Sequence, residues 1–255
     1  MNGTQRADHY RMIWDYHTHT IHSHGVLYKH GKGTILENTE AAARAGLREL
    51  AISDHGPGHK LYGLRMSELP EMRQEIAMAK RRFPQVQVWL SVEANIIDTP
   101  NGLDVTEEEA TRFDFLLAGY HYGLPKGHMT GNFISSKRLI PSGSREALRI
   151  LNTEMTLRAL YENRIRILTH PGDKAPVDME AVARACEETG TWMEINTRHR
   201  HLTVEEIRIA QNYDVKFVIS SDAHTPDRVG DYRGGIVRAV EAGLDLSRII
   251  NIEEI

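Results

Sequence analysis

This sequence has very little cysteine: Cys186 is the one cysteine in 255 residues. A single cysteine excludes an intrachain disulfide framework and fits a reducing compartment. Helical spacing in MEAVARACEET predicts that Cys186 packs in a core. The stretch MNGTQRADHYRMI at the start lacks the apolar segment of a signal peptide. We therefore expect a cytoplasmic protein.

Long hydrophobic runs and an excess of positive charge are also absent. No apolar run approaches the roughly 20 residues of a membrane-spanning helix, so we expect no membrane contact. The 31 basic and 35 acidic residues give a net charge of −4, which makes binding to nucleic acid unlikely. The sequence leaves the oligomeric state open.

Short apolar runs alternate with amphipathic stretches along the whole sequence. The apolar runs are residues 12–17, 47–55, 86–94, 113–121, 165–170, 191–196 and 216–224. The helix candidates are residues 38–46, 66–83, 144–163, 178–190, 203–213 and 234–243. This alternation predicts an α/β fold with a parallel sheet and helices outside it. No linker stands out, so we expect a single domain over residues 1–255. A closed or nearly closed seven-stranded barrel is favoured over a doubly wound open sheet.

Cap residues give the expected helix boundaries. Asn38 or Thr39 would begin one helix, Ser144 another and Asp178 a third, because short polar side chains cap helix amino termini. Residues 123–143 contain Gly, Pro and Ser with weak periodicity. We expect there a long loop of the kind that lines binding sites.

Each apolar run ends in a residue that can bind a metal or polarise a substrate. These residues are His17, His19, His55, Glu93, His121, His170, Glu194 or Asn196, Asp222 and His224. The carboxyl ends of barrel strands open on one face, which carries the active site. The pairs His17-x-His19 and Asp222-x-His224 place two side chains on the same face of an extended segment. We therefore expect these residues to converge, with His24 returning from the first turn.

Imidazoles mixed with carboxylates suit zinc, manganese or iron, and the absence of cysteine ligands argues against a purely structural zinc site. The candidate metal ligands are His17, His19, His24, His55, Glu93, His121, His170, Asp222 and His224. Nine ligands are a natural set for two or three divalent ions, with Glu93 and Asp222 as bridging candidates.

The remaining histidines are assigned no role in metal binding. We interpret His9, His30, His59 and His128 as ordinary polar residues, and His22 stays ambiguous.

The motifs DYHTHTIHSHG, AISDHG, SVEAN, GYHYG, LTHPG and ISSDAH, in this order over residues 14–224, resemble those of the PHP (polymerase and histidinol phosphatase) superfamily. The similarity is greatest to its stand-alone branch of YcdX-type phosphatases. The histidinol-phosphate phosphatases, the nearest other branch, usually have a longer step between the second and third histidines than that from His19 to His24.

The resemblance implies a distorted seven-stranded (β/α) barrel of TIM-like, PHP type, a trinuclear metal centre and phosphoesterase activity. It implies three ligand sets: His17, His19, Glu93 and Asp222; His24, His55 and His224; and Glu93, His121 and His170. It also implies that Glu93, Asp222 and His224 serve catalysis.

For the reaction we expect a metal-bridging hydroxide to attack a small phosphomonoester. Arg198 and Arg228 are candidates for binding the substrate phosphate, since the planar guanidinium suits phosphate oxygens. Two alternatives stay open: an amidohydrolase-like enzyme, although no strand ends in lysine, and a non-catalytic PHP accessory module.

Overall fold

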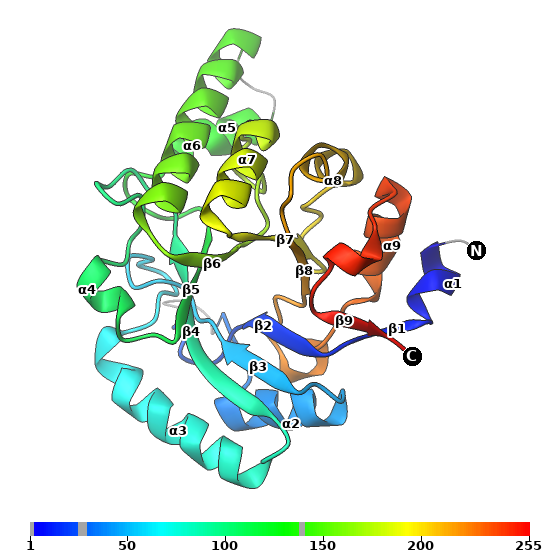
Figure 1. The fold of residues 1–255 in the computed structure, drawn as a ribbon. Helices are drawn as coiled ribbons and strands as arrows, with labels where there is room; N and C mark the ends of the chain where they lie inside the picture. The colour runs from blue at the N-terminus through cyan, green and yellow to red at the C-terminus, as the bar shows by residue number, and fades with distance from the viewer. Residues whose placement is uncertain (1–2, 25–29, 138–140) are drawn as a thin grey trace.

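Seven parallel strands form a nearly closed barrel at the centre of the molecule (Figure 1). The computed structural model describes residues 3–24, 30–137 and 141–255. In spatial order the barrel strands are β2 (Trp14–Thr18), β3 (Glu49–Ile52), β4 (Gln87–Asn95), β5 (Phe115–Gly119), β6 (Ile165–Leu168), β7 (Trp192–Asn196) and β8 (Phe217–Ser220). Each strand pairs in parallel with the next. The predicted barrel is confirmed.

The seam of the barrel lies between β2 and β8. An isolated parallel bridge joins Thr18 to Ala223 there. Nearer the amino ends of the strands, the buried side chain of Asn251 spans the seam. Its Nδ2 donates hydrogen bonds to the carbonyl oxygens of Trp14 (2.9 Å) and Ile219 (2.7 Å). Its Oδ1 accepts one from the amide of Ile219 (2.9 Å). One side chain thus connects both strands.

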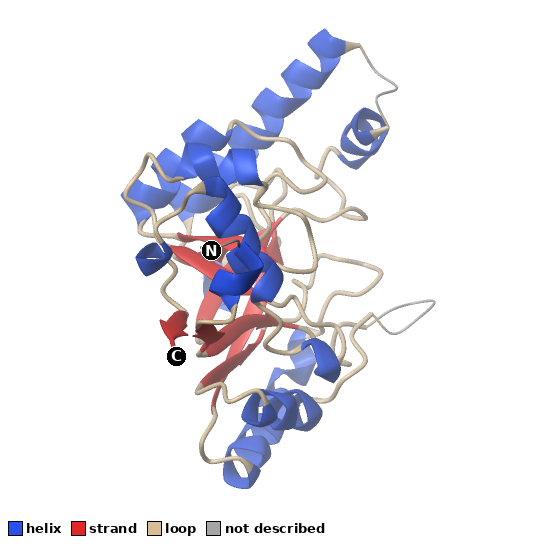
Figure 2. Ribbon diagram, turned by 90° about the vertical axis from the view of Figure 1, so that its right-hand side faces the viewer, coloured by secondary structure: helices blue, strands red, loops and turns tan. Residues whose placement is uncertain are grey.

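Helices surround the barrel, as the alternating pattern predicts (Figures 1 and 2). They are α2 (Ile35–Arg44), α3 (Leu69–Arg82), α4 (Glu107–Ala110), α6 (Ser142–Glu162), α7 (Met179–Thr189), α8 (Val204–Ala210) and α9 (Arg233–Ala242). The 3-10 helices of the described residues are η1 (Met66–Glu68), which precedes α3, η2 (Pro226–Arg228), which precedes α9, and η3 (Leu246–Arg248), which follows α9. In Figure 2 the loops gather on one side of the strands.

The predicted start of α2 is wrong. The helix begins at Ile35 after Thr34, whose hydroxyl accepts a hydrogen bond from the amide of Glu37. The Glu37 carboxylate in turn accepts from the amide of Thr34, which completes a capping box. Asn38 and Thr39 lie inside the helix because this earlier pair already satisfies its free amides.

Of the other two predicted caps, Ser144 is wrong and Asp178 is confirmed. α6 begins at Ser142, so the predicted cap Ser144 lies inside the helix. Asp178 caps α7 as predicted, with its carboxylate accepting from the amide of Ala181 (3.2 Å).

The predicted loop 123–143 contains a helix, α5 (Met129–Ser136). Residues 138–140 lie outside the described residues. The buried side chains of α5 are the polar Asn132 and Ser135, so an apolar stripe did not reveal it. Asn132 donates from Nδ2 to the hydroxyl of Tyr120 (3.1 Å), which attaches α5 to the end of β5.

A small antiparallel sheet outside the barrel joins the two ends of the described chain. β1 (Tyr10–Met12) pairs with β9 (Ile252–Glu254), and α1 (Gly3–Ala7) packs against α9. The sequence pattern did not predict these strands, because three residues are too few to show an alternation.

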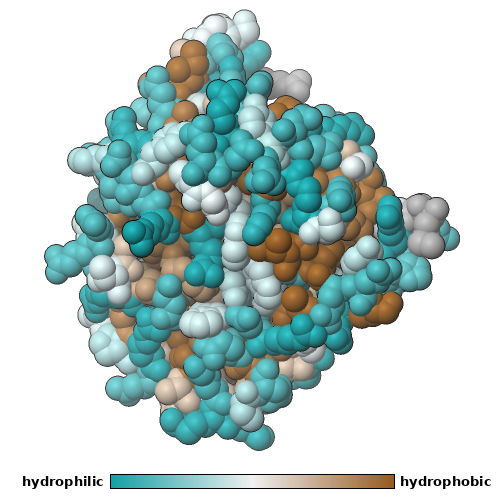
Figure 3. Space-filling model, viewed as in Figure 1, coloured by the Kyte–Doolittle hydropathy of each residue, from teal (hydrophilic) through white to brown (hydrophobic). Residues whose placement is uncertain are grey.

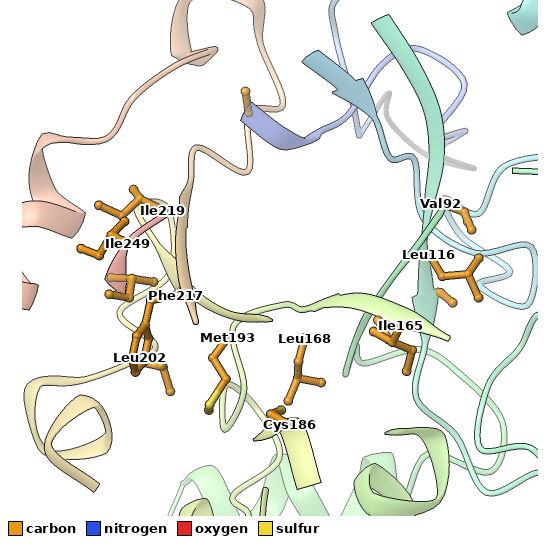
Figure 4. Close-up of a cluster of buried hydrophobic side chains, with 14 of the residues drawn as sticks. Val92, Leu116, Ile165, Leu168, Cys186, Met193, Leu202, Phe217, Ile219 and Ile249 are labelled. Carbon is orange, nitrogen blue, oxygen red and sulfur yellow. The ribbon is translucent and has the colours of Figure 1, made fainter. Parts of the chain in front are cut away.

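Apolar side chains occupy both sides of the barrel wall. Figure 4 shows Leu116, Met193 and Phe217 pointing away from the ring of strands. This outer layer includes Cys186, which is fully buried as predicted. A smaller cluster comprises Trp14, Tyr16, Ala51, Leu117, Ile167 and Val218. Successive residues of a strand face opposite sides, so these residues fill the barrel interior below the strand ends.

Hydrophilic residues cover most of the face seen in Figure 3, with hydrophobic patches between them. Across residues 3–24, 30–137 and 141–255, no helix is both long and apolar enough to span a bilayer.

Candidate metal centre

All but one of the predicted metal ligands meet where the barrel strands end. This group, called the central cluster below, comprises His17, His19, His55, Glu93, His121, His170, Asp222 and His224. Every member is buried. The expected convergence of residues that are far apart in the sequence is therefore what the structure shows.

Glu93, near the end of β4, is the centre of the cluster. Its carboxylate oxygens lie within 3.6 Å of five imidazoles, from four different strand ends. The distances are 3.2 Å to His17 Nε2, 3.6 Å to His19 Nε2, 3.0 Å to His55 Nδ1, 3.5 Å to His121 Nε2 and 3.0 Å to His170 Nε2. One carboxylate surrounded in this way is suited to bridge neighbouring ions.

Asp222 is the second carboxylate of the central cluster. Its Oδ1 lies 3.3 Å from His19 Nε2 and 3.2 Å from His224 Nδ1. Asp222 has a φ of 48° and His170 a φ of 28°, a region that residues with a Cβ rarely adopt. Strained backbone of this kind concentrates at functional sites.

The potential ligand atoms fall into overlapping buried groups, within each of which they lie within 4.8 Å of one another. Four such groups are His17, His19 and Asp222; His19, His55 and His224; His17, Glu93 and His170; and His55, Glu93 and His121. Shared members are what a cluster of adjacent ions needs.

Several buried polar atoms of the cluster have no hydrogen-bond partner among the described residues. They are His17 Nε2, both ring nitrogens of His19 and of His55, His170 Nδ1, Glu93 Oε2 and Asp222 Oδ1. Burying such atoms without a partner is costly. Divalent cations would satisfy them, so the residues present fit a metal centre.

The protonation states also fit metal binding. Burial lowers the pKa of His19, His55 and His121, which leaves these rings neutral and able to bind a cation. Burial alone would raise the pKa of Glu93 and of Asp222, but neighbouring imidazoles, His17 first, hold both well below their usual range. The cluster therefore offers ionised carboxylates beside the neutral imidazoles of His19, His55 and His121. Burial acts to lower the pKa of His17, but the carboxylates around this ring, Glu93 first, raise it.

Hydrogen bonds behind the cluster orient two of its rings. His17 Nδ1 lies 2.7 Å from Oε1 of the buried Glu194, so that this nitrogen donates and Nε2 faces the cluster. His121 Nδ1 lies 2.8 Å from Oδ1 of Asn95. The Nδ2 of Asn95 donates to Asp104 (2.6 Å), which fixes the amide. Partners of this kind set which ring nitrogen is free for a metal. Sequence reasoning named Glu194 only as one strand end among several.

Two backbone features make room for the ligands. The pairing register of β2 with β3 shifts between Asp15 and Thr18, and irregularities of this kind re-aim side chains, here at His17. At the end of β5, Gly119 lies directly beside the cluster. A Cβ at this position would be 2.1 Å from Thr169 Oγ1 and 3.0 Å from Glu93 Oε1, so no larger residue fits.

His24 does not take the place expected of it. Its Nε2 lies 2.7 Å from Glu68 Oε2, beside His22. The ring of His30, interpreted from the sequence as an ordinary polar residue, lies instead 4.4 Å from the ring of His224 and 5.1 Å from that of His55. Both histidines precede a glycine, so spacing alone favoured the nearer one.

The two candidate arginines lie in different surroundings. Arg198 follows β7, and its Nη1 lies 2.6 Å from His224 Nε2 and 3.6 Å from Asp222 Oδ1. Arg228, in η2, donates to Asp231 (2.7 Å).

His199, which follows Arg198 after β7, also reaches the cluster. Its Nε2 lies 3.3 Å from Asp222 Oδ2, and its Nδ1 lies 3.2 Å from Asp173 Oδ2.

Comparison with known proteins adds to this geometry. A probable phosphatase of Acetivibrio thermocellus is 30% identical over 236 residues, which cover 87% of this chain and 83% of the relative. A probable phosphatase of Thermoanaerobacter sp. strain X514 is 27% identical over 257 residues, covering 95% and 91%.

Among solved structures, histidinol phosphate phosphatase from Lactococcus lactis, complexed with zinc, L-histidinol and phosphate, is similar with a TM-score of 0.62 at 14% identity. The match covers 92% of this chain and 95% of that one, and at this identity it supports the fold. Residues 15–198 match the family described as the PHP domain. The chain belongs to the PHP family, as its motifs indicate.

Proposed function

We propose that this chain, a metal-dependent phosphoesterase of the PHP family, hydrolyses small phosphomonoesters at the central cluster. The observation that carries the proposal is the set of buried ligand atoms left without hydrogen-bond partners in the described structure. Such atoms at the strand ends need cations. The similarity to probable phosphatases supports a phosphoester as the bond that is broken.

The proposal includes three ions, with zinc, manganese or iron as the metals that suit these ligands. The ligand sets are those expected from the family resemblance, with His30 in place of His24: His17, His19, Glu93 and Asp222; His30, His55 and His224; and Glu93, His121 and His170. Glu93 and Asp222 supply the negative charge that holds the cations together.

When bound, the ions would supply a water-derived nucleophile at neutral pH and neutralise phosphate charge. The chain itself supplies orientation and substrate contacts. Glu194 fixes the ring of His17, and Arg198, which is half exposed beside His224, is placed to bind a phosphate oxygen with its planar donors. Arg228, already paired with Asp231, is the weaker candidate.

Taking His30 instead of His24 as the third histidine of the first motif brings histidinol phosphate back among the candidate substrates. The expectation against histidinol phosphate rested on the five-residue step from His19 to His24. With His30 in that place the step is eleven residues, so the argument against histidinol phosphate no longer holds. Histidinol phosphate therefore belongs in the first substrate panel.

A cytoplasmic location completes the proposal, supported by the single buried cysteine, which leaves this sequence without an intrachain disulfide.

The test is metal analysis of the purified protein followed by hydrolysis of a panel of phosphomonoesters, phosphodiesters and cyclic amides. We expect at least three transition-metal atoms per chain, and phosphomonoesterase activity that chelation removes and Zn²⁺ or Mn²⁺ restores. Full activity of metal-free protein, or turnover of cyclic amides alone, would overturn the proposal. The variant H30Q should lose activity, whereas H9Q, at an exposed histidine, should retain it.

A further inference from the structure

A second group of metal-binding side chains lies where the segment after β2 meets η1 and α3. It brings together His22 and His24 from that segment with Glu68 at the end of η1 and Glu75 on α3. We propose that His22, His24 and Glu68 form a separate site for a divalent transition-metal ion such as Zn²⁺, with Glu75 beside it.

The distances suit a common ion. His24 Nε2 lies 2.7 Å and His22 Nδ1 lies 3.1 Å from the same oxygen, Glu68 Oε2. The ligand atoms of these three residues all lie within 4.8 Å of one another. Ligand atoms of a tetrahedral zinc ion are about 3.4 Å apart, given bonds of roughly 2.1 Å. Small side-chain shifts would therefore suffice to admit an ion.

The chemistry of the group calls for a cation. Two imidazole nitrogens converge on one carboxylate oxygen, while the other nitrogen of His22 lies 3.3 Å from Glu75 Oε1. A neutral imidazole has only one N–H, so His22 satisfies both carboxylates by hydrogen bonding only when it carries an extra proton. A bound metal would replace that proton. Histidine nitrogens with carboxylate oxygens are a common zinc ligand set.

The site is formed in part and remains accessible. The side chain of His22 is 7% exposed, those of Glu68 and Glu75 are 18% and 23% exposed, and that of His24 is 36% exposed. A nearby cation, Arg65, lies 3.5 Å from Glu68 Oε1. The oxygen that faces the imidazoles is the other one, Oε2. An ion can therefore enter at His24 while buried His22 holds its other side.

A third carboxylate, that of Asp54, fixes the turn that carries these histidines. Asp54 accepts hydrogen bonds from the amide and hydroxyl of Thr20 (2.7 Å each) and from the hydroxyl of Ser23 (2.6 Å). His22 lies between them, three residues after His19 of the central cluster. An ion on His22 and Glu68 would thus connect the segment after β2 to η1 and α3, a structural role distinct from catalysis.

Zinc stoichiometry tests the site without requiring turnover. The full-length protein is stripped with chelator, dialysed against buffered Zn²⁺ and analysed by atomic emission. We expect E68Q and H24Q each to bind about one zinc atom per chain fewer than the wild type. The control E71Q, at an exposed glutamate in the first turn of α3, should bind as many as the wild type.

Three results would overturn the proposal. The first is an unchanged zinc content in E68Q. The second is an equal loss in E71Q. The third is a loss in H24Q but not in E68Q, which would return His24 to the central cluster. Circular dichroism establishes that each variant is folded. Because His24 is the more exposed of the two varied side chains, H24Q is expected to disturb folding least. Failure of the phosphatase proposal would leave these counts unaffected.

Discussion

Glu194 illustrates how one residue organises several others. Its Oε1 faces His17 Nδ1, while its Oε2 accepts from the amide of His170 (2.8 Å) and from Nδ2 of Asn196 (2.9 Å). A carboxylate can accept all of these bonds because it carries no hydrogen of its own. A glutamine amide in its place would point its own N–H groups at one of these donors, where a carboxylate oxygen now accepts.

We therefore predict that E194Q weakens metal binding about 10- to 100-fold, the range found when the partners of metal-bound histidines are changed. Competition of Zn²⁺ with a chromophoric chelator measures this affinity directly. E188Q, at an exposed glutamate of α7 that accepts a hydrogen bond from the hydroxyl of Tyr161, provides the matched control and should bind zinc normally. Equal zinc affinities of E194Q and the wild type would contradict the orienting role.

At the scale of single residues, the sequence predicted which strand-end side chains come together, because a parallel barrel turns those positions toward one face. It did not predict that His24 lies beside Glu68, whereas His30 lies beside His55 and His224. These positions depend on tertiary contacts, which spacing does not determine. Asn95 was missed and Glu194 was named only as one strand end among several, since a residue that orients a ligand has the same sequence signature as any buried polar residue.

Among the elements, α7 offers a test of capping. The Asp178 carboxylate accepts from the amide of Ala181, and its Oδ2 lies 2.9 Å from Arg149 Nη1 of α6. The hydrogen bond from Arg149 lowers the pKa of Asp178 below its usual value of 3.8. Ionised Asp178 therefore stabilises the fold above that value, and this contribution is lost as the pH falls through the lowered pKa.

We predict that D178A costs about 1 kcal/mol of unfolding free energy at pH 7, the usual cost of losing a cap. D178N retains the capping oxygen and should lose only the contribution of the charge. Urea unfolding of the three proteins measures both effects. The difference between wild type and D178N should shrink as the pH falls below about 4; a difference independent of pH would contradict the ion pair.

Helix and strand order followed from periodicity and was predicted nearly in full. Boundaries were less predictable. Thr34 competes with Asn38 and Thr39 as a cap, and only the reciprocal bond with Glu37 decides between them. The helix α5 was not predicted because it buries the polar Asn132 and not an apolar stripe. Both outcomes depend on partners that a local pattern does not contain.

For the whole molecule, the buried side chain of Asn251 is one of the connections across the seam between β2 and β8. Asn251, fully buried, makes three hydrogen bonds to the backbone of Trp14 and Ile219. Removing it leaves buried backbone groups without partners, each at a cost of about 1–3 kcal/mol.

We predict that N251A lowers the unfolding free energy by about 3 kcal/mol or more. Chemical denaturation monitored by tryptophan fluorescence measures this loss. N212A removes an exposed asparagine that donates to backbone carbonyl oxygens near the end of α8, and it should change stability by less than about 0.5 kcal/mol. Comparable losses in N251A and N212A would show that the seam needs no such connection.

Gly119 gives the strand ends a different kind of constraint. The position carries no functional group, yet a single methyl there would collide with Thr169 and press on the carboxylate of Glu93. A saturation-mutagenesis survey scored by survival would therefore group Gly119 with the histidines of the central cluster. Intolerance to substitution alone would not show that Gly119 contributes no ligand or reactive group. The contribution of residue 119 is the absence of a side chain.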